Sequence, residues 1–354
     1  MSSSTMTQRT TPWFLILTSV PHTNSLSLVV TRPILTDYSG VFGWYLLGPL
    51  LGPTLGPLFG GLIVQHLGWR WIFWILTIVC MLNTALGIFF LKESYAPVIL
   101  EQRRQTREKE EGGTYRLPED YEDDRSLSTK LASAMQRPLK ILFTQPIVFT
   151  MAVYQAIIFD TVYTLYTNFQ DIYSGIYGFN TTQVGLTYLG PGIGFLLAVW
   201  FIVPRIDTVF NALTSSNNGK SKPEFRLPLA NIGSVFIPLS LFWFAWTIES
   251  RQHWFVTILS TVFFGIGQVC IMNSVQNYYI DAFSKYAASA IAAGAVFRSV
   301  VGGTVPLFAP SLFDRLGYGW GISVFGFLSV AIAPSPLLFF YFGETVRSKF
   351  TVKL

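Results

Sequence analysis

The stretch "GWYLLGPLLGPTLGPLFGGL", residues 43–62, decides the fold class. Glycine recurs at every fourth position from Gly48 to Gly60, and a proline follows each of the first three of these glycines. In the interior of a helix exposed to water, glycine costs about 1 kcal/mol and proline about 3 kcal/mol relative to alanine. No charged residue marks the stretch as a surface loop. It therefore needs surroundings that tolerate small residues and missing backbone hydrogen bonds.

The composition of the whole chain indicates what those surroundings are. Of its 354 residues, 51% are hydrophobic and 12% are charged, whereas about 25% are charged in soluble domains. So little charge cannot cover a surface that faces water, and we predict an all-helical polytopic membrane protein. The net charge of +5 does not indicate nucleic-acid binding, because the basic residues flank apolar spans. Cys80 and Cys270 both fall in apolar runs, so no disulfide framework is expected.

The apolar runs divide the chain into segments. A helix needs about 20 apolar residues to cross the hydrocarbon of a bilayer. Eight stretches are long enough: 41–64, 71–91, 147–167, 184–203, 229–248, 254–280, 288–310 and 320–343. The predicted organisation is an N-terminal segment 1–40, two helices in 41–91, a linker 92–145, a six-helix bundle 146–343 and a tail 344–354. The linker holds ten Lys/Arg and ten Asp/Glu residues, so we expect it to be solvated and flexible.

The distribution of Lys and Arg predicts the orientation in the membrane, because short cytoplasmic loops carry the excess of these residues. With both termini and the linker inside, 20 of the 24 Lys/Arg residues are inner, three are outer, and Arg298 lies within a span. The outer loop 168–183 has no Lys or Arg and contains Asn180-Thr181-Thr182, a candidate glycosylation acceptor. We therefore predict cytoplasmic N- and C-termini.

The glycines of the opening stretch have a role in a bilayer. Helices in lipid are held together by close packing of small residues rather than by the hydrophobic effect. Gly48, Gly52, Gly56 and Gly60 are predicted to form a groove for a neighbouring helix, and the three prolines are expected to loosen and bend their own helix. A tightly packed helix with a purely structural role is the alternative.

The spacing in this helix resembles a known signature. Its residues follow the pattern G-x8-G-x3-GP-x2-GG, and the matching positions are Gly43, Gly52, Gly56, Pro57, Gly60 and Gly61. This resembles the antiporter signature on the fifth helix of proton-coupled drug exporters in the major facilitator superfamily. The segments "GWRWIFWIL" (68–76), "PEFRLP" (223–228) and "YAASAIAAGAVFRS" (286–299) are similar to later parts of the fungal drug:proton antiporters. The resemblance covers about residues 40 to 350.

The resemblance also implies a deficit. Members of the family have twelve helices in two six-helix halves, with the binding site between the halves. Only two predicted spans precede the linker here, so the family's first four helices have no counterpart, and residues 1–40 do not match. We interpret the chain as a truncated gene product or an incomplete gene model. The alternative is a genuine eight-helix protein that dimerises to complete its cavity.

Ionisable residues inside a bilayer are costly and are functional candidates by default. Asp160 lies in the middle of the third span, with Tyr163 near its face. This pair suggests a substrate-facing stripe in which Asp160 binds a cation or a proton. The alternative is a protonated carboxyl group hydrogen-bonded to a neighbouring helix. Arg298 matches an "RS" element of the family and either lines the cavity or extends its side chain to the cytoplasmic headgroups.

Amide side chains concentrate in the sixth span, within "GQVCIMNSVQNYYID" (267–281). Gln268, Asn273, Gln276 and Asn277 must face protein or a wet cavity, because an amide facing lipid is costly. We expect Asn273 and Asn277, which share a helical face, to line the cavity; interhelical hydrogen bonding is the alternative. Just after the fourth span, Asp207 with Arg205 suggests an inner-face charge latch or a solvated helix end.

No motif points to catalysis. His22, His66 and His253 lie outside the spans, and neither a metal-ligand cluster nor a nucleotide-binding loop is visible, so no enzyme activity, metal or cofactor is expected. The resemblance implies a plasma-membrane transporter that expels a small amphipathic or cationic organic molecule in exchange for protons by alternating access, with a vacuolar or other internal membrane left open. The alternative is a truncated, non-transporting membrane protein that lacks half of its cavity. The expected partners are a small-molecule substrate, protons and the lipid bilayer; the oligomeric state is left open.

Overall fold

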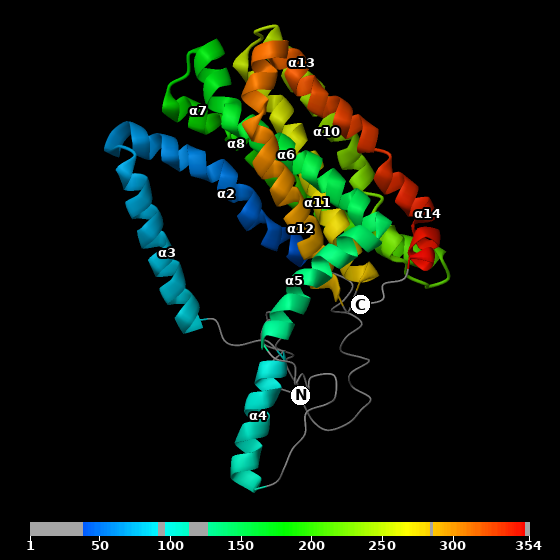
Figure 1. Cartoon of the computed structure of the whole chain (residues 1–354). Coiled ribbons are helices and arrows are strands. Elements are labelled where there is room, and N and C mark those ends of the chain that lie inside the picture. The colour runs from blue at the N-terminus through cyan, green and yellow to red at the C-terminus, as the bar shows by residue number, and fades with distance from the viewer. Residues whose placement is uncertain (1–37, 91–95, 113–126, 284–285, 351–354) are drawn as a thin grey trace, which may run out of the picture. The chain divides into compact units, whose positions relative to one another are not determined.

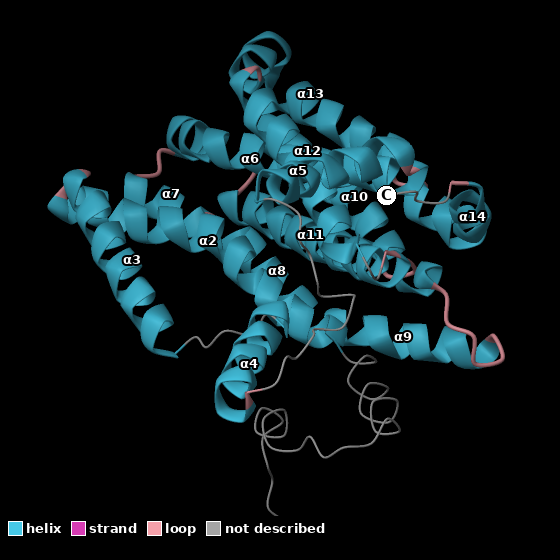
Figure 2. Ribbon diagram, turned by 60° about the horizontal axis from the view of Figure 1, so that its bottom comes forward, coloured by secondary structure: helices cyan, strands magenta, loops and turns pink. Residues whose placement is uncertain are grey.

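The computed structural model describes residues 38–90, 96–112, 127–283 and 286–350. Within these ranges every regular element is helical and no strand occurs, which confirms the predicted all-helical fold class (Figures 1 and 2). The predicted N-terminal segment 1–40 lies almost wholly outside the described residues.

Eight helical stretches among the described residues are long and apolar enough to cross a membrane, in the predicted order. Four of them are α2 (Tyr38–Leu67), α3 (Arg70–Phe90), α10 (Ala230–Glu249) and α11 (Trp254–Ala282). The others are α6 (Pro146–Tyr177), the series α7 (Thr181–Thr187), α8 (Leu189–Phe201) and α9 (Val203–Ser216), the pair α12 (Ala287–Thr304) and η3 (Val305–Leu307), and the pair α13 (Ala309–Ile332) and α14 (Ser335–Lys349).

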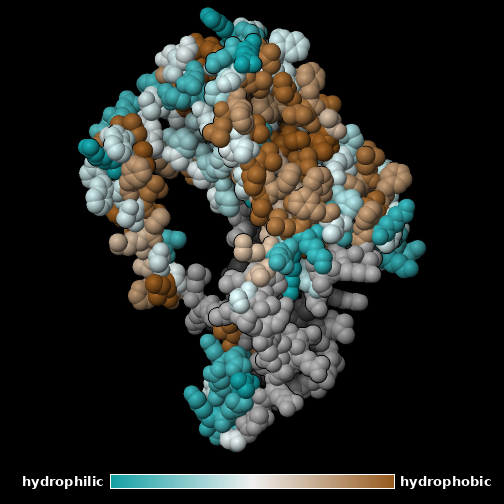
Figure 3. Space-filling model, viewed as in Figure 1, coloured by the Kyte–Doolittle hydropathy of each residue, from teal (hydrophilic) through white to brown (hydrophobic). Residues whose placement is uncertain are grey.

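The surface of the bundle agrees with a lipid environment. In Figure 3, hydrophobic side chains form a broad region over α13 and its neighbours, and hydrophilic side chains gather beyond both ends of that region. Large apolar residues of α13, such as Phe327 and Leu328, are about half exposed. In α3, none of the residues is buried against the rest of the described chain.

One helix is longer than the apolar pattern predicts. The third span was expected to end at residue 167, but α6 continues to Tyr177. Residues 168–177, "NFQDIYSGIY", are more polar than the preceding part of the span, yet they continue the helix, and their members Phe169, Ile172 and Tyr173 are buried. The helix ends at Gly178, which takes the left-handed conformation (φ 68°, ψ 25°) that favours glycine.

The linker is also more ordered than its composition suggests. Its described residues form α4 (Ala96–Glu111) and α5 (Leu127–Thr144). Helix α5 packs on α6 and α12, with Ile141 and Leu142 buried while Phe143 remains largely exposed. An apolar stripe on one side of an otherwise polar helix explains this docking.

Helix α4 is held by ion pairs along its own surface. Arg104 contacts Glu101 at 2.6 Å and Glu108 at 3.0 Å, so that one arginine bridges two carboxylates on the same face. Hydrogen bonding to Arg104 is the main cause that lowers the pKa of Glu101 to about 2. The polar part of the linker therefore includes a helix stabilised by its alternating charges.

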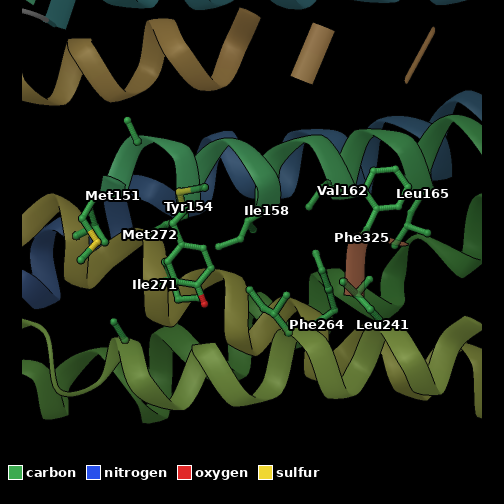
Figure 4. Close-up of a cluster of buried hydrophobic side chains, with 14 of the residues drawn as sticks. Met151, Tyr154, Ile158, Val162, Leu165, Leu241, Phe264, Ile271, Met272 and Phe325 are labelled. Carbon is green, nitrogen blue, oxygen red and sulfur yellow. The ribbon is translucent and has the colours of Figure 1, made fainter. Parts of the chain in front are cut away.

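The hydrophobic core of the bundle lies where α6, α10, α11 and α13 meet (Figure 4). Side chains of α6 contribute Met151, Tyr154, Ile158, Val162 and Leu165, and the other helices contribute Leu241, Phe264, Ile271, Met272 and Phe325. The hydroxyl group of Tyr154 donates a 3.0 Å hydrogen bond to Ser234 on α10, which satisfies a polar group in the core.

Glycines let α11 approach two neighbours closely. A Cβ atom added at Gly265 would lie 2.5 Å from the carbonyl oxygen of Pro191 on α8. On α10, a Cβ atom added at Gly233 would lie 2.5 Å from the carbonyl oxygen of Gly267. Such contacts allow no larger residue, as expected where helices in lipid pack through small side chains. Helix α11 is thereby fixed between α8 and α10.

Candidate functional site

The six signature residues all lie in α2, but they are not equivalent. A Cβ atom added at Gly61 would lie 2.8 Å from the carbonyl oxygen of Thr181, the first residue of α7. The carbonyl oxygen of Pro57 lies 2.8 Å from the Cβ position of Gly185 on α7. A hydrogen bond from Thr182 to Gln65 joins the same two helices. Pro57 and Gly61 thus form the contact between α2 and α7.

The remaining glycines of α2 differ from the predicted groove. A Cβ atom added at Gly48, Gly52, Gly56 or Gly60 would meet no described atom within 4 Å. Positions spaced by four residues stay near one face of a helix, whereas Gly61 lies about 100° further round than Gly60. Among the described helices, none fills the groove that these four glycines form. Gly43 also lies in α2, without a described contact that assigns it a role.

A cavity of about 510 Å³ lies between α2, α6, α11 and α12. Its wall is mainly apolar and combines aliphatic, aromatic and thioether side chains with three polar ones. The residues that characterise it are Leu50, Phe159, Met272, Ile291, Gln268, Gln276 and Arg298. A mostly apolar pocket with a few converging polar groups is typical of a small-molecule site, and the volume is in the usual range.

The two glutamines of the cavity come from one face of α11. Gln268 and Gln276 flank Met272 in a row spaced by four residues, and both side chains are at least 95% buried. Their Oε1 atoms accept no hydrogen bond from any described residue. Because an unpaired buried polar atom costs roughly 1–3 kcal/mol, such groups call for a ligand or water as partner.

Arg298 enters the cavity from α12. Its guanidinium carbon lies 5.2 Å from the centre of the Phe159 ring, a cation–π distance. Its Nε atom is buried and unpaired with respect to the described residues. Arg298 lies eleven residues after Ala287, where its span begins, which is about 16 Å along the helix axis. The structure places Arg298 in the wall of the cavity, which is one of the two environments that the sequence left open.

Asp160 and Tyr163 lie beside this cavity on α6. Asp160 is buried, and its Oδ1 atom has no hydrogen-bond partner among the described residues. The ring of Tyr163 packs against that of Phe159, with centroids 4.6 Å apart. Neither residue belongs to the cavity wall, although Phe159 does. The role of Asp160 in binding a proton or a cation stays a prediction.

Asn273 and Asn277 occupy a different face of α11. Both are fully buried, and the Nδ2 atom of Asn277 donates to the Oδ1 atom of Asn273 at 2.6 Å. They are absent from the cavity wall in the described structure. Asn273 follows Met272 and Asn277 follows Gln276, so each is rotated about 100° around the helix axis from the residues that face the cavity. The two pairs have the same spacing of four residues, so spacing alone could not show which pair faces the cavity.

Sequence reasoning missed a buried arginine at the ends of α9 and α11. Arg226, in η1 (Pro223–Arg226), is 1% exposed and forms ion pairs with Asp207 and, at 2.7 Å, with Asp281. Its guanidinium group also lies 3.9 Å from the centre of the Phe210 ring. The sequence suggested Arg205 as the partner of Asp207 because it is a near neighbour, but Arg205 is exposed. Nineteen residues separate Asp207 from Arg226, and only folding brings them together.

Asn180 has a structural role at the start of α7. Its side chain accepts a 2.9 Å hydrogen bond from the backbone N–H of Gln183, whose own side chain accepts from the backbone of Asn180. This reciprocal arrangement is a capping box. Asn180 is exposed, and its glycosylation stays a prediction.

Comparison with known proteins agrees with this architecture. The sequence model of the Major Facilitator Superfamily matches residues 24–306, so the match begins within the segment 1–40 that the resemblance left out. The chain is 39% identical over 309 residues to "MFS transporter cpaT" of Aspergillus oryzae, which covers 86% of this chain and 61% of that protein. It is 37% identical over 330 residues to "MFS-type transporter penM" of Penicillium rubens, a match that covers 93% of this chain and 65% of that protein. It is 38% identical over 308 residues to "Efflux pump vrtL" of Penicillium aethiopicum, a match that covers 86% of this chain and 60% of that protein.

The chain thus spans about three-fifths of the length of the curated relatives it matches. The family match extends over most of the chain and includes the helices that form the cavity. Together with eight helical stretches able to cross a bilayer, it makes the chain an integral, multi-pass membrane protein. The chain belongs to the Major Facilitator Superfamily.

Proposed function

We propose that this chain functions in the proton-coupled efflux of a small amphipathic organic molecule by alternating access, with the cavity between α2, α6, α11 and α12 as its substrate site. The observation that carries the proposal is the convergence of Gln268, Gln276 and Arg298 on that cavity, each with a buried polar atom unpaired by any described residue. Apolar neighbours in the same wall suit the rest of an amphipathic ligand. The name of the relative vrtL, an efflux pump, supports the direction of transport.

Alternating access requires helices that can move against one another. The contact between Pro57 on α2 and Gly185 on α7 is made by backbone atoms with no intervening side chains. Such a contact supports a sliding or rocking movement, because no interdigitated side chains need to separate. The prolines of α2 also weaken its backbone hydrogen bonding, which favours bending.

Proton coupling requires a group that changes its protonation inside the membrane. Asp160 is the candidate, because it is a buried carboxyl group on α6 next to Phe159 of the cavity wall. Intramembrane carboxyl groups are typical of proton relays in transporters. Transport rather than catalysis, a plasma-membrane location and cytoplasmic termini complete the proposal.

A second candidate is a membrane protein that inserts without transporting. The observation that favours it is that the chain spans about three-fifths of the length of its relatives. The two candidates make opposite predictions about flux.

The test is dye efflux from yeast cells that lack their own drug exporters and express this chain. Cells are loaded with rhodamine 6G, fluorescein or Nile red, which are cationic, anionic and neutral, and dye retention is measured by flow cytometry. We expect lower retention of at least one dye than in cells without the chain, and loss of that difference when an uncoupler collapses the proton gradient. Unchanged retention of all three dyes, with the chain present in the membrane, favours the non-transporting candidate. Export that survives the uncoupler contradicts proton coupling.

A further inference from the structure

The cavity wall has a definite charge. Among the described residues that line it, Arg298 alone is ionisable, and the polar remainder consists of the amides Gln268 and Gln276. Asp160 follows Phe159 in the chain but does not belong to the wall. The cavity therefore presents one positive charge and no negative one to a molecule that enters it.

That positive charge has no counter-ion in the described structure. The ion pairs among the described residues involve Arg104, Lys222, Arg226 and Arg347, and none involves Arg298. Its contact with Phe159 is a cation–π interaction, which offsets only part of the cost of removing a guanidinium group from water. An intramembrane arginine in the middle of a helix usually pairs with an anion or faces water.

We propose, resting on the proposed function, that the cavity recognises an anionic amphipathic molecule, an organic acid with an apolar body, and that Arg298 binds its carboxylate or equivalent anion. A guanidinium group matches a carboxylate with two parallel hydrogen bonds, which a neutral ligand cannot offer. The cationic class that the sequence left open does not fit, because a cation next to Arg298 is repelled in a low-dielectric cavity.

The other groups of the wall define the rest of the ligand. The unpaired Oε1 atoms of Gln268 and Gln276 are acceptors, so they suit hydroxyl donors on the ligand. Phe159, Met272 and Ile291 provide the apolar contact. The class is thus a hydroxylated organic acid with an aromatic or aliphatic body that fits about 510 Å³.

The same chemistry, an anion on an apolar body, also describes an anionic lipid. Because the cavity lies in a membrane protein, the headgroup of such a lipid is an alternative source of the anion. The proposal assigns the site to a transported acid, and the experiment includes an arm with anionic lipid to separate the two sources.

The experiment measures binding to the purified chain in nanodiscs of phosphatidylcholine by isothermal titration calorimetry, with empty nanodiscs as the blank. Three probes share one ring system and differ in charge: 1-naphthaleneacetate, 1-naphthaleneethanol and 1-naphthylmethylammonium. We expect the anion to bind at least tenfold more tightly than the alcohol, and the ammonium to bind most weakly.

Arg298→Gln should reduce the preference for the anion to less than twofold, and Arg298→Lys should retain part of it. Arg251→Gln, which removes an exposed arginine that does not belong to the cavity wall, should leave the preference unchanged.

Different results would overturn the anion preference, the assignment of the cavity as substrate site, or the choice of a transported acid over a lipid. If the alcohol binds as tightly as the anion and Arg298→Gln changes neither, while Phe159→Ala weakens both, the proposed anion recognition is wrong and the cavity remains the substrate site. If no probe binds in a way that depends on Phe159 or Gln276, the assignment of the cavity as substrate site fails, and the inference fails with it.

If phosphatidylglycerol in the nanodiscs weakens binding of the anion tenfold but not of the alcohol, a lipid headgroup occupies the site and the transported acid is excluded. Size-exclusion chromatography and thermal melting verify that each variant is folded.

Discussion

The carbonyl oxygen of Pro57 lies 2.8 Å from the position that a Cβ atom would take at Gly185. Two helices separated by more than a hundred residues of sequence thus meet backbone to backbone. In lipid this closeness contributes van der Waals packing that larger side chains would prevent. Of the signature residues, Pro57 and Gly61 contact α7, whereas a Cβ atom added at Gly52, Gly56 or Gly60 would meet no described atom within 4 Å.

The first prediction concerns this contact. Gly185→Val places a branched side chain against the backbone of α2, so we expect a loss of about 1–3 kcal/mol in folding free energy or a separation of the two helices. Gly56→Val is the matched control, because a Cβ atom at Gly56 meets no described atom within 4 Å. Thermal melting in detergent, together with dye retention in yeast, measures both effects. Equal losses for the two variants would contradict the assigned contact.

The second prediction concerns the buried charges around Arg226. Arg226→Ala leaves the carboxylate of Asp207 buried without its principal partner, and breaking a buried pair in this way costs about 3–5 kcal/mol. Lys222→Ala is the control, because the Lys222–Glu344 pair is largely exposed and such pairs contribute about 0–1 kcal/mol. Unfolding in a series of detergent–denaturant mixtures compares the variants. A melting temperature for Arg226→Ala equal to that of Lys222→Ala contradicts the interpretation.

The third prediction concerns the packing of α8 on α11. Gly265→Ala adds one carbon 2.5 Å from the carbonyl oxygen of Pro191, which forces the helices apart and is expected to cost about 1–3 kcal/mol. Gly175→Ala in α6 adds the same atom where no described atom lies within 4 Å, and alanine should slightly favour the helix. Thermal melting should therefore move in opposite directions for the two variants, and a stable Gly265→Ala variant argues against close α8–α11 packing.

The fourth prediction concerns a break in α13. Gly317 has φ 73° and ψ 172°, a region of backbone conformation that is essentially limited to glycine. Two residues later, the backbone N–H of Gly319 donates a 2.9 Å hydrogen bond to the carboxylate of Glu249. Gly317→Asn should cost about 1–3 kcal/mol. Gly178→Asn should cost much less, because Gly178 has the left-handed φ 68°, ψ 25° that asparagine tolerates. Similar melting temperatures for the two variants would show that the break is not strained.

The hydrophobic spans could be predicted from the sequence because membrane helices are defined by length and apolarity, which are local properties. The same criterion failed where a helix is partly polar. The eighth span was expected at 320–343, but the helical series starts at Ala309, passes through the break at Gly317 and ends with α14 at Lys349. The charges of Asp314 and Arg315 lower the hydropathy of the first turns without preventing a helix.

The cavity could be predicted only in part, because its wall depends on which helix faces meet. The sequence identified Arg298 as a candidate from its charge inside a span, and amides as candidates from their cost in lipid. Choosing Gln268 and Gln276 over Asn273 and Asn277 requires knowledge of how α11 is rotated between α8 and α10. That rotation is set by the contacts of Gly265 and Gly267, which the sequence alone does not pair with Pro191 and Gly233.

The most direct test of the account replaces the unpaired amides of the cavity. The double variant Gln268→Leu with Gln276→Leu keeps similar side-chain volumes and removes two buried polar groups, so it should fold at least as well as the natural chain. We predict that dye efflux in exporter-deficient yeast is abolished in this variant at an unchanged amount of protein in the membrane. Gln252→Leu, in the exposed connection after α10, should export like the natural chain. Full dye efflux by the double variant would contradict the claim that this cavity carries the substrate.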